Sequence, residues 1–201
     1  CFEGAKVFPT IVHCAAKLRV ALKDKLLLFT FRTKTEGGKV ALAHEEYLHF
    51  IRTVLATDCA DLIDIEFFTA GAELPALIEE ARTAGAAVVC SSHDFHKTPP
   101  RAELVSRMVA MQQAGADLPK LAVMPQSRAD VLELLAATAE MADRHPETPI
   151  ITMSMGALGA VSRLAGEALG SAMTFANPGQ ASAPGQISLE IVNEVLDALH
   201  L

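Results

Sequence analysis

Hydrophobic residues follow two spacings along the chain, and these spacings predict strands and helices in alternation. Residues 26–31 form a short, nearly all-apolar run, which is typical of a strand buried on both faces. Ahead of it, residues 9–22 place apolar side chains every three or four positions, as on one face of a helix. The chain is therefore predicted to have an α/β fold.

The same order of elements repeats to the end of the chain. Strands are expected to start near residues 26, 61, 87, 120, 149 and 172. Helices are expected over residues 9–22, 43–57, 73–84, 100–114, 127–144 and 158–169 and at the C-terminus, with Ser127 and Asp130 as a capping pair. Strand starts lie about 23 to 35 residues apart, a spacing that indicates parallel strands joined by crossover helices.

Two architectures share this order, an open doubly wound sheet and a closed (β/α)8 barrel. No Gly-x-Gly-x-x-Gly loop follows the first strand, which weakens the nucleotide-binding sheet. Arg32, His93 and the loop after Met153 fall at C-terminal strand ends, where barrel enzymes carry their chemistry. We therefore expect residues 1–201 to form a single β/α barrel domain of the TIM-barrel family.

This barrel is expected to be incomplete. Only six strands are predicted, and the first predicted helix has no strand before it. Such barrels usually need about 250 residues, so the first βα unit and the second strand, together about 50 residues, are expected to be missing ahead of Cys1.

Composition narrows the classes of partner. The net charge is −7 and the 17 basic residues are scattered, so neither nucleic acid nor an anionic membrane is expected as a partner. No apolar run approaches the roughly 18 residues of a membrane span. The four cysteines show no paired spacing, which is typical of free thiols in the cytoplasm. A small molecule is the expected partner.

Lys120 is the most unusual position in the predicted strands. It begins an apolar run that is bounded by Pro119 and Pro125. Burial lowers the pKa of an amine and makes its neutral form available as a nucleophile towards a carbonyl. The alternative is a lysine that reaches water along its own stem.

Four further groups of residues could serve an active site. His93 follows a buried strand and could exchange protons, although histidines at strand ends are often structural. Arg32 could bind a carboxylate or hydroxyl and Glu36 could orient a histidine, or both could lie in a solvated loop. Arg163 follows a run of small residues and could bind a carboxylate, and residues 181–186 suit a polyhydroxylated acid.

A metal site is not expected. His93 and His96 are spaced as His-x-x-His, but no clustered cysteine or carboxylate completes the set. The spacing fits neither strand alternation nor the His-Glu-x-x-His zinc pattern.

Five stretches in this order resemble the type I 3-dehydroquinate dehydratase family. They run from about residue 26 to the C-terminus and contain all the candidates above. The stretches are Phe29-Thr30-Phe31-Arg32 to Glu36-Gly37-Gly38, Ser92-His93-Asp94-Phe95-His96-Lys97-Thr98-Pro99, Pro119-Lys120-Leu121-Ala122-Val123-Met124-Pro125-Gln126-Ser127, Ser154-Met155-Gly156 to Arg163-Leu164-Ala165-Gly166-Glu167, and Ser182-Ala183-Pro184-Gly185-Gln186.

The resemblance implies a (β/α)8 barrel, a homodimer, no metal or cofactor, and dehydration of 3-dehydroquinate to 3-dehydroshikimate in the shikimate pathway of aromatic amino acid biosynthesis. It implies an imine on Lys120, with His93 as general acid and base oriented by Glu36. It further implies that Arg163 binds the substrate carboxylate. Contacts to the hydroxyls and carboxylate are implied for Arg32, Ser182 and Gln186. The pocket lining is implied to include Met153, Met155 and Phe175.

The family also has a substrate-binding Glu-x-Arg pair near its N-terminus, and no such strand precedes Cys1. Two alternatives therefore stay open beside the dehydratase. One is another Schiff-base barrel, such as a class I aldolase. The other is a catalytically impaired remnant that lacks its N-terminal strands.

Overall fold

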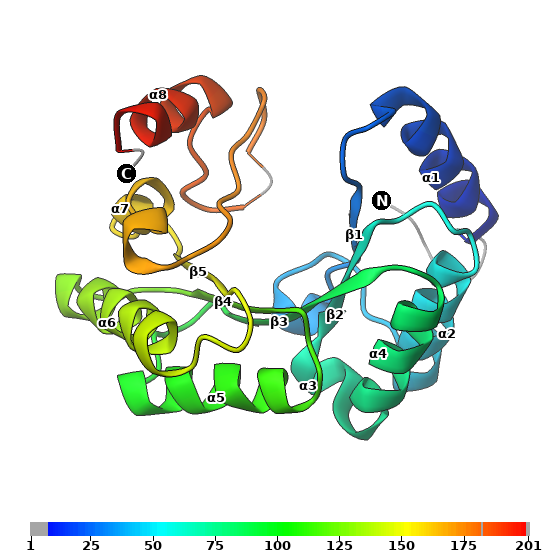
Figure 1. Cartoon of the computed structure of the whole chain (residues 1–201), viewed down its shortest axis with the longest axis horizontal. Coiled ribbons are helices and arrows are strands. Elements are labelled where there is room, and N and C mark those ends of the chain that lie inside the picture. Colours follow the sequence, from blue (N-terminus) through cyan, green and yellow to red (C-terminus); the bar gives the residue numbers. More distant parts are fainter. Residues whose placement is uncertain (1–7, 182, 200–201) are drawn as a thin grey trace. The chain divides into compact units, whose positions relative to one another are not determined.

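The computed structural model describes residues 8–181 and 183–199, which divide into two compact units. Residues up to 92, together with 113–117, form the first unit, and residues 93–112 and those from 118 onward form the second. Figure 1 labels the helices and strands of both units. Among the described residues, no helix combines the length and apolar character needed to cross a membrane.

The first unit contains parallel strands in the predicted order. These are β1 (Leu28–Thr30), β2 (Leu62–Glu66) and most of β3 (Ala87–Asp94). β2 pairs with β1 on one side and with β3 on the other, and all five of its residues are buried. Burial on both faces explains why this strand is so apolar, and it makes its two acidic residues exceptional.

Amphipathic helices contribute one part of the buried core of the first unit. α1 (Phe8–Leu22), α2 (His44–Leu55) and α4 (Leu74–Thr83) match three predicted helices, and the short α3 (Phe67–Ala70) precedes α4. α2 packs beside α4, as Figure 1 also shows, and Arg52 Nε donates to Glu80 Oε2 at 2.8 Å. The apolar sides of these two helices are buried, including Tyr47, Ile51, Leu77 and Ile78.

The second unit is built around β4 (Leu118–Val123) and β5 (Ile151–Ser154), which are parallel. Its helices are α5 (Arg101–Gln113, all but its last residue), α6 (Arg128–Arg144), α7 (Ala160–Leu164) and α8 (Leu189–Leu199). The capping prediction for α6 is confirmed, because Asp130 N donates to Ser127 Oγ at 3.2 Å. α6 contacts β5, where the Thr138 and Thr152 hydroxyls are hydrogen-bonded at 2.7 Å.

Two predictions near the C-terminus were wrong. Residues 172–175 form no strand; a single parallel bridge joins Ser171 to Ile150. Next to this bridge, Thr152 N donates to the Ser171 hydroxyl at 3.1 Å, so a side-chain oxygen takes the place of a backbone carbonyl as the partner of β5. The helix expected over 158–169 is divided into α7 and a 3-10 turn (Glu167–Leu169). Gly166 lies at the break, where a Cβ would approach Ser162 O to 2.6 Å.

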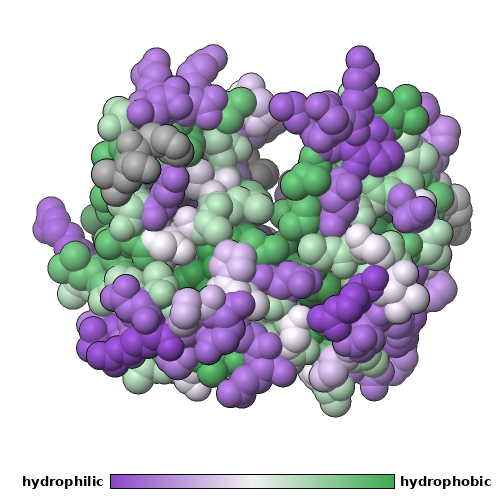
Figure 2. Space-filling view, viewed as in Figure 1, coloured by the Kyte–Doolittle hydropathy of each residue, from purple (hydrophilic) through white to green (hydrophobic). Residues whose placement is uncertain are grey.

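Polar and apolar residues alternate on the outer surface of both units. On the face in Figure 2, hydrophilic side chains are interspersed with hydrophobic ones. Large exposed hydrophobic residues occur on several elements, for example Val20 on α1, Phe68 on α3, Leu132 on α6 and Ile191 on α8. Exposed apolar residues are ordinary in globular proteins.

Candidate active site

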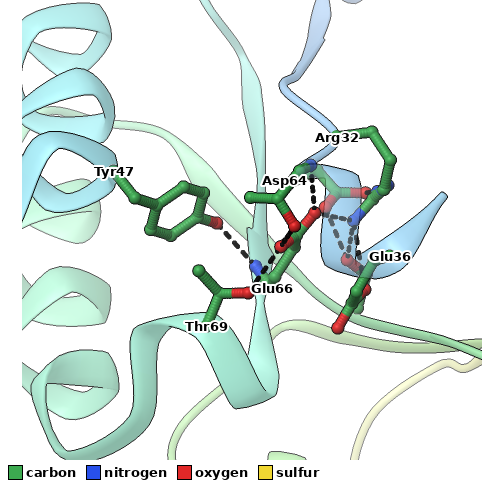
Figure 3. Close-up of polar contacts among 8 residues, drawn as sticks. Arg32, Glu36, Tyr47, Asp64, Glu66 and Thr69 are labelled. Atoms are coloured by element: carbon green, nitrogen blue, oxygen red, sulfur yellow. Dashed lines mark hydrogen bonds and ion pairs between the residues drawn. The ribbon is translucent and has the colours of Figure 1, made fainter. Parts of the chain in front are cut away.

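Arg32 lies among three carboxylates in the first unit (Figure 3). Its Nη2 is 2.8 Å from Asp64 Oδ2, and its Nη1 is 3.0 Å from Glu66 Oε1 and 3.4 Å from Glu36 Oε2. Nη1 also donates to Ser91 Oγ at 3.0 Å. The alternative of a solvated loop was wrong, because Asp64 and Glu66 are fully buried and Glu36 is nearly so.

The electrostatics of this cluster are dominated by the carboxylates. Burial acts to lower the pKa of Arg32, but the carboxylates of Asp64, Glu66 and Glu36 outweigh it and hold the pKa above its usual value. One guanidinium therefore faces three acids. Such surroundings favour a neutral hydroxyl over a fourth carboxylate as an additional partner of Arg32.

Lys120 is the third residue of β4 and is buried, with 6% of its surface exposed. The prediction of a buried lysine is confirmed, and the alternative of a lysine reaching bulk water is wrong. The strand begins two residues earlier than predicted, so Lys120 lies inside it and pairs with Ile151. Its Nζ lies 4.6 Å from the centroid of the Phe175 ring, whose face covers the amine.

Arg163 is buried within the second unit. Its Nη1 is 3.5 Å from Met153 Sδ and its Nη2 donates to Pro184 O at 3.2 Å, while its buried Nε has no partner among the described residues. Burial lowers the pKa of Arg163. Unlike Arg32, this cation has no carboxylate partner among the described residues of its unit, so it can accept an anion.

The strand register brings Arg163 to the face of β4 that carries Lys120. Met153 pairs with Ala122, which is two residues beyond Lys120 and therefore points to the same side of the sheet. Because the guanidinium touches Met153, a buried amine and a buried arginine share one strand face. Met155, also predicted to line the pocket, is buried after β5, and its N donates to Val123 O at 2.8 Å.

The loop at 183–186 packs closely on the glycine loop that follows β5. Gly156 N donates to Pro184 O at 3.3 Å, and a Cβ on Gly185 would come within 2.4 Å of Gly156 O. Gln186 follows, with its carbonyl accepting a hydrogen bond from Asn177 Nδ2 at 3.3 Å. The two loops are therefore in direct backbone contact, whereas Ser182 lies outside the described residues.

His93 is the penultimate residue of β3 and belongs to the second unit. The loop after it is fastened to the segment that follows β4. Gln126 Nε2 donates to His96 O at 2.8 Å, and Met124 N donates to Lys97 O at 3.3 Å. These bonds tie the end of the His93 strand to the end of the Lys120 strand. Glu36 belongs to the first unit, so its pairing with His93 stays a prediction.

The sequence reasoning missed the acids that surround Arg32. Asp64 and Glu66 stand two residues apart in a buried strand, so both point to the same face. Ser91, which donates to Asp64 Oδ1 at 2.6 Å, lies beside Glu66 on the neighbouring strand. Charged residues at period two within an apolar strand were the available signal. Across the part of the chain that the structure describes, no three His, Cys, Asp or Glu side chains gather to hold a metal ion.

Fold and site together define a parallel α/β protein in which a shielded primary amine, and an arginine without a carboxylate partner among the described residues of its unit, lie on one face of the β4–β5 pair. Such a site is suited to a compound that carries both a carbonyl and a carboxylate. Residues 2–201 match the type I 3-dehydroquinase family. The chain belongs to this family, which confirms the resemblance seen in its five sequence stretches.

Similar proteins agree with this assignment. The chain is 48% identical over 198 residues to a 3-dehydroquinate dehydratase of Klebsiella pneumoniae subsp. pneumoniae, covering 98% of this chain and 79% of that protein. A Clostridium difficile type I 3-dehydroquinate dehydratase with covalently modified comenic acid is 44% identical with a TM-score of 0.93, covering 99% and 78% of the two chains.

A Geobacillus kaustophilus 3-dehydroquinate dehydratase is 38% identical and also has a TM-score of 0.93, over 98% of this chain and 77% of that one. These similarities confirm the predicted fold class, the α/β fold of the (β/α)8 barrel family. The prediction that residues 1–201 form a single domain stays a prediction.

Proposed function

We propose that the chain dehydrates 3-dehydroquinate to 3-dehydroshikimate through a Schiff base on Lys120, within the shikimate pathway. The observation that carries this proposal is the position of Lys120, a buried amine inside a parallel strand, with Arg163 of α7 against Met153 on the same face of the β4–β5 pair. Family membership supports the substrate, and the covalently modified acid in the Clostridium difficile relative supports covalent chemistry.

The chemistry explains why an amine is needed. Attack of the Lys120 Nζ on the substrate ketone and loss of one water gives a protonated imine, which acidifies the neighbouring C–H more than the ketone does. Removal of that proton gives an enamine, and the enamine expels the β-hydroxyl as water. A second water hydrolyses the imine, which frees the lysine and releases a product that is one water lighter than the substrate.

His93 is the proposed proton carrier. It would accept the C–H proton and return one to the departing hydroxyl, since imidazole exchanges protons near neutral pH. The hydrogen bonds from Gln126 and Met124 to the loop after His93 support its placement near the end of β4. Glu36 is proposed to orient the imidazole.

The two arginines are proposed to have different roles. Arg163 would bind the substrate carboxylate, because it is buried and, among the described residues of its unit, it has no acid partner and its Nε has no hydrogen-bond partner. Arg32 would contact hydroxyls, because three carboxylates already surround it. Ser182 and Gln186 are proposed as further polar contacts, and Met153, Met155 and Phe175 as the apolar lining.

Turnover by point variants tests the assignment of roles. Product formation from 3-dehydroquinate is followed by the absorbance of the conjugated enone in the wild-type protein, Lys120→Met and His93→Ala. Lys17→Ala is the matched control, because Lys17 is exposed on α1. We expect Lys120→Met and His93→Ala to lose at least about a hundredfold in kcat and Lys17→Ala to lose nothing.

Each alternative gives a different outcome. Conversion of other ketones or aldehydes, but not of 3-dehydroquinate, would favour an aldolase-type enzyme. A folded wild-type protein without any turnover would favour the catalytically impaired remnant. Normal turnover by His93→Ala would remove the role assigned to that histidine.

The proposal includes a homodimer, which family membership supports. It also includes a location in the cytoplasm, which fits four cysteines without paired spacing. Light scattering coupled to size exclusion would give twice the chain mass of 21.4 kDa for the dimer. A monomer over the whole concentration range would contradict this part of the proposal.

A further inference from the structure

Glu66 is a buried carboxylate for which the proposed reaction has no use. It is the last residue of β2, fully buried, and its own backbone N donates to the Tyr47 hydroxyl of α2 at 2.8 Å (Figure 3). Burying a carboxylate is costly unless donors surround it, and Glu66 has four. Each of these donors lies on Arg32, Thr33 or Thr69.

Three of the four donors belong to the segment that carries Arg32. Glu66 Oε1 accepts from Arg32 Nη1 at 3.0 Å and from Thr33 N at 2.8 Å. Glu66 Oε2 accepts from Thr33 Oγ1 at 2.7 Å. The carboxylate therefore holds both the guanidinium and the main chain that follows it. The 3-10 turn Lys34–Glu36, which carries Glu36, begins directly after this anchored residue.

We infer that Glu66 is a positioning residue, which fixes Arg32 and the Lys34–Glu36 turn on the end of β2 by hydrogen-bond geometry. This inference rests on the proposed function, in which Arg32 contacts the substrate and Glu36 orients His93. Asp64 differs from Glu66 in its contacts, since it pairs with Arg32 Nη2 and accepts a hydrogen bond from the Ser91 hydroxyl.

The two oxygens of Glu66 have different chemical requirements. Oε1 accepts from a guanidinium and an amide, which can only donate, so this position must remain an oxygen. Oε2 accepts from the hydroxyls of Thr33 and Thr69, the latter at 2.6 Å, and hydroxyls can reverse to become acceptors. A glutamine can therefore replace Glu66 with its oxygen at Oε1 and its NH2 at Oε2.

Two variants consequently separate geometry from charge. Glu66→Gln removes the charge and keeps the length and the hydrogen bonds. Glu66→Asp keeps the charge but is one methylene shorter, so it cannot hold the guanidinium and the main chain together. A positioning role predicts that Glu66→Asp is the more damaging change, whereas a purely electrostatic role predicts the opposite order.

The test combines amide hydrogen exchange with steady-state kinetics on the full chain. In Glu66→Asp, we expect amides of residues 29–38 to exchange about tenfold faster than in the wild type, with residues 151–154 of β5 unchanged. We expect KM for 3-dehydroquinate to rise about tenfold in Glu66→Asp and to stay within about threefold in Glu66→Gln.

Equal damage in both variants, or greater damage in Glu66→Gln, would overturn the inference. So would unchanged exchange over residues 29–38 in Glu66→Asp. Failure of the proposed function has a different signature, because a wild-type protein without turnover leaves the exchange comparison intact. The order of exchange rates then decides the role of Glu66 by itself.

Discussion

Replacing Arg163 by methionine should make the protein more stable and less active. Arg163 is 2% exposed, its Nε has no partner among the described residues, and its two remaining contacts are a 3.5 Å approach to Met153 Sδ and a 3.2 Å bond to Pro184 O. Methionine keeps most of the apolar stem and removes the buried cation. If Arg163 binds an anion as proposed, the wild-type residue should destabilise the free protein.

The magnitude follows from the contacts. Burying a charged group with unmet hydrogen-bonding capacity costs several kcal/mol, and a hydrogen bond such as that to Pro184 O returns about 1 kcal/mol. We expect a net gain of about 2 kcal/mol in the free energy of unfolding of Arg163→Met. For a domain of this size that corresponds to a rise of about 4–8 °C in Tm.

Activity should change in the opposite direction. Loss of a buried charged partner of the substrate carboxylate costs about 3 kcal/mol, which lowers kcat/KM about a hundredfold. The assays are thermal unfolding by circular dichroism and turnover of 3-dehydroquinate. Arg52→Met is the matched control, because Arg52 is half-exposed and paired with Glu80. The free energy of unfolding of this control should fall by at most about 1 kcal/mol, and its activity should stay unchanged. A less stable Arg163→Met, or one with wild-type kcat/KM, would refute the reasoning.

Two further predictions concern a loop and a helix start. Gly185→Ala should lower the free energy of unfolding in urea by about 1–3 kcal/mol and raise KM, because Gly185 has a φ of +75° and the new Cβ would meet Gly156 O. Gly179→Ala is the control and should change neither quantity, because the space around Gly179 is open. Asp130→Ala should lower Tm near neutral pH but not in acid. The pKa of Asp130 is lowered, first by the bond from Gln126 N and then by Ser127, so its stabilisation is present above pH 3.8 and disappears as pH falls through the lower folded-state pKa. An effect of equal size at low pH would contradict this.

Strand and helix order could be predicted from the sequence because buried parallel strands and amphipathic helices have different periods. The boundaries were less accurate where side chains replaced backbone bonds, as at Ser171, or where glycines allowed close approach, as at Gly166. The start of β4 was misplaced because Pro119 looked like a boundary. Pairing with β5 begins only at Lys120, so the missing N–H of Pro119 costs no ladder bond there.

The candidate site was predictable where a residue was unusual in its immediate context. Lys120 stood out as a charge in an apolar strand, and its burial is confirmed. The network around Glu66 was not predicted, because apart from the nearby Thr69 its partners Tyr47 and Thr33 lie 19 and 33 residues away in the sequence. Partners of this kind are chosen by tertiary packing, which local spacing does not encode.

Covalent capture at Lys120 tests the central claim most directly. The protein is incubated with 3-dehydroquinate, reduced with borohydride, digested and mapped by mass spectrometry. We predict that the mass of the reduced substrate or product adduct appears on the peptide containing Lys120 and is lost in Lys120→Met. An active protein that carries no adduct, or that carries it on another lysine, would contradict the claim.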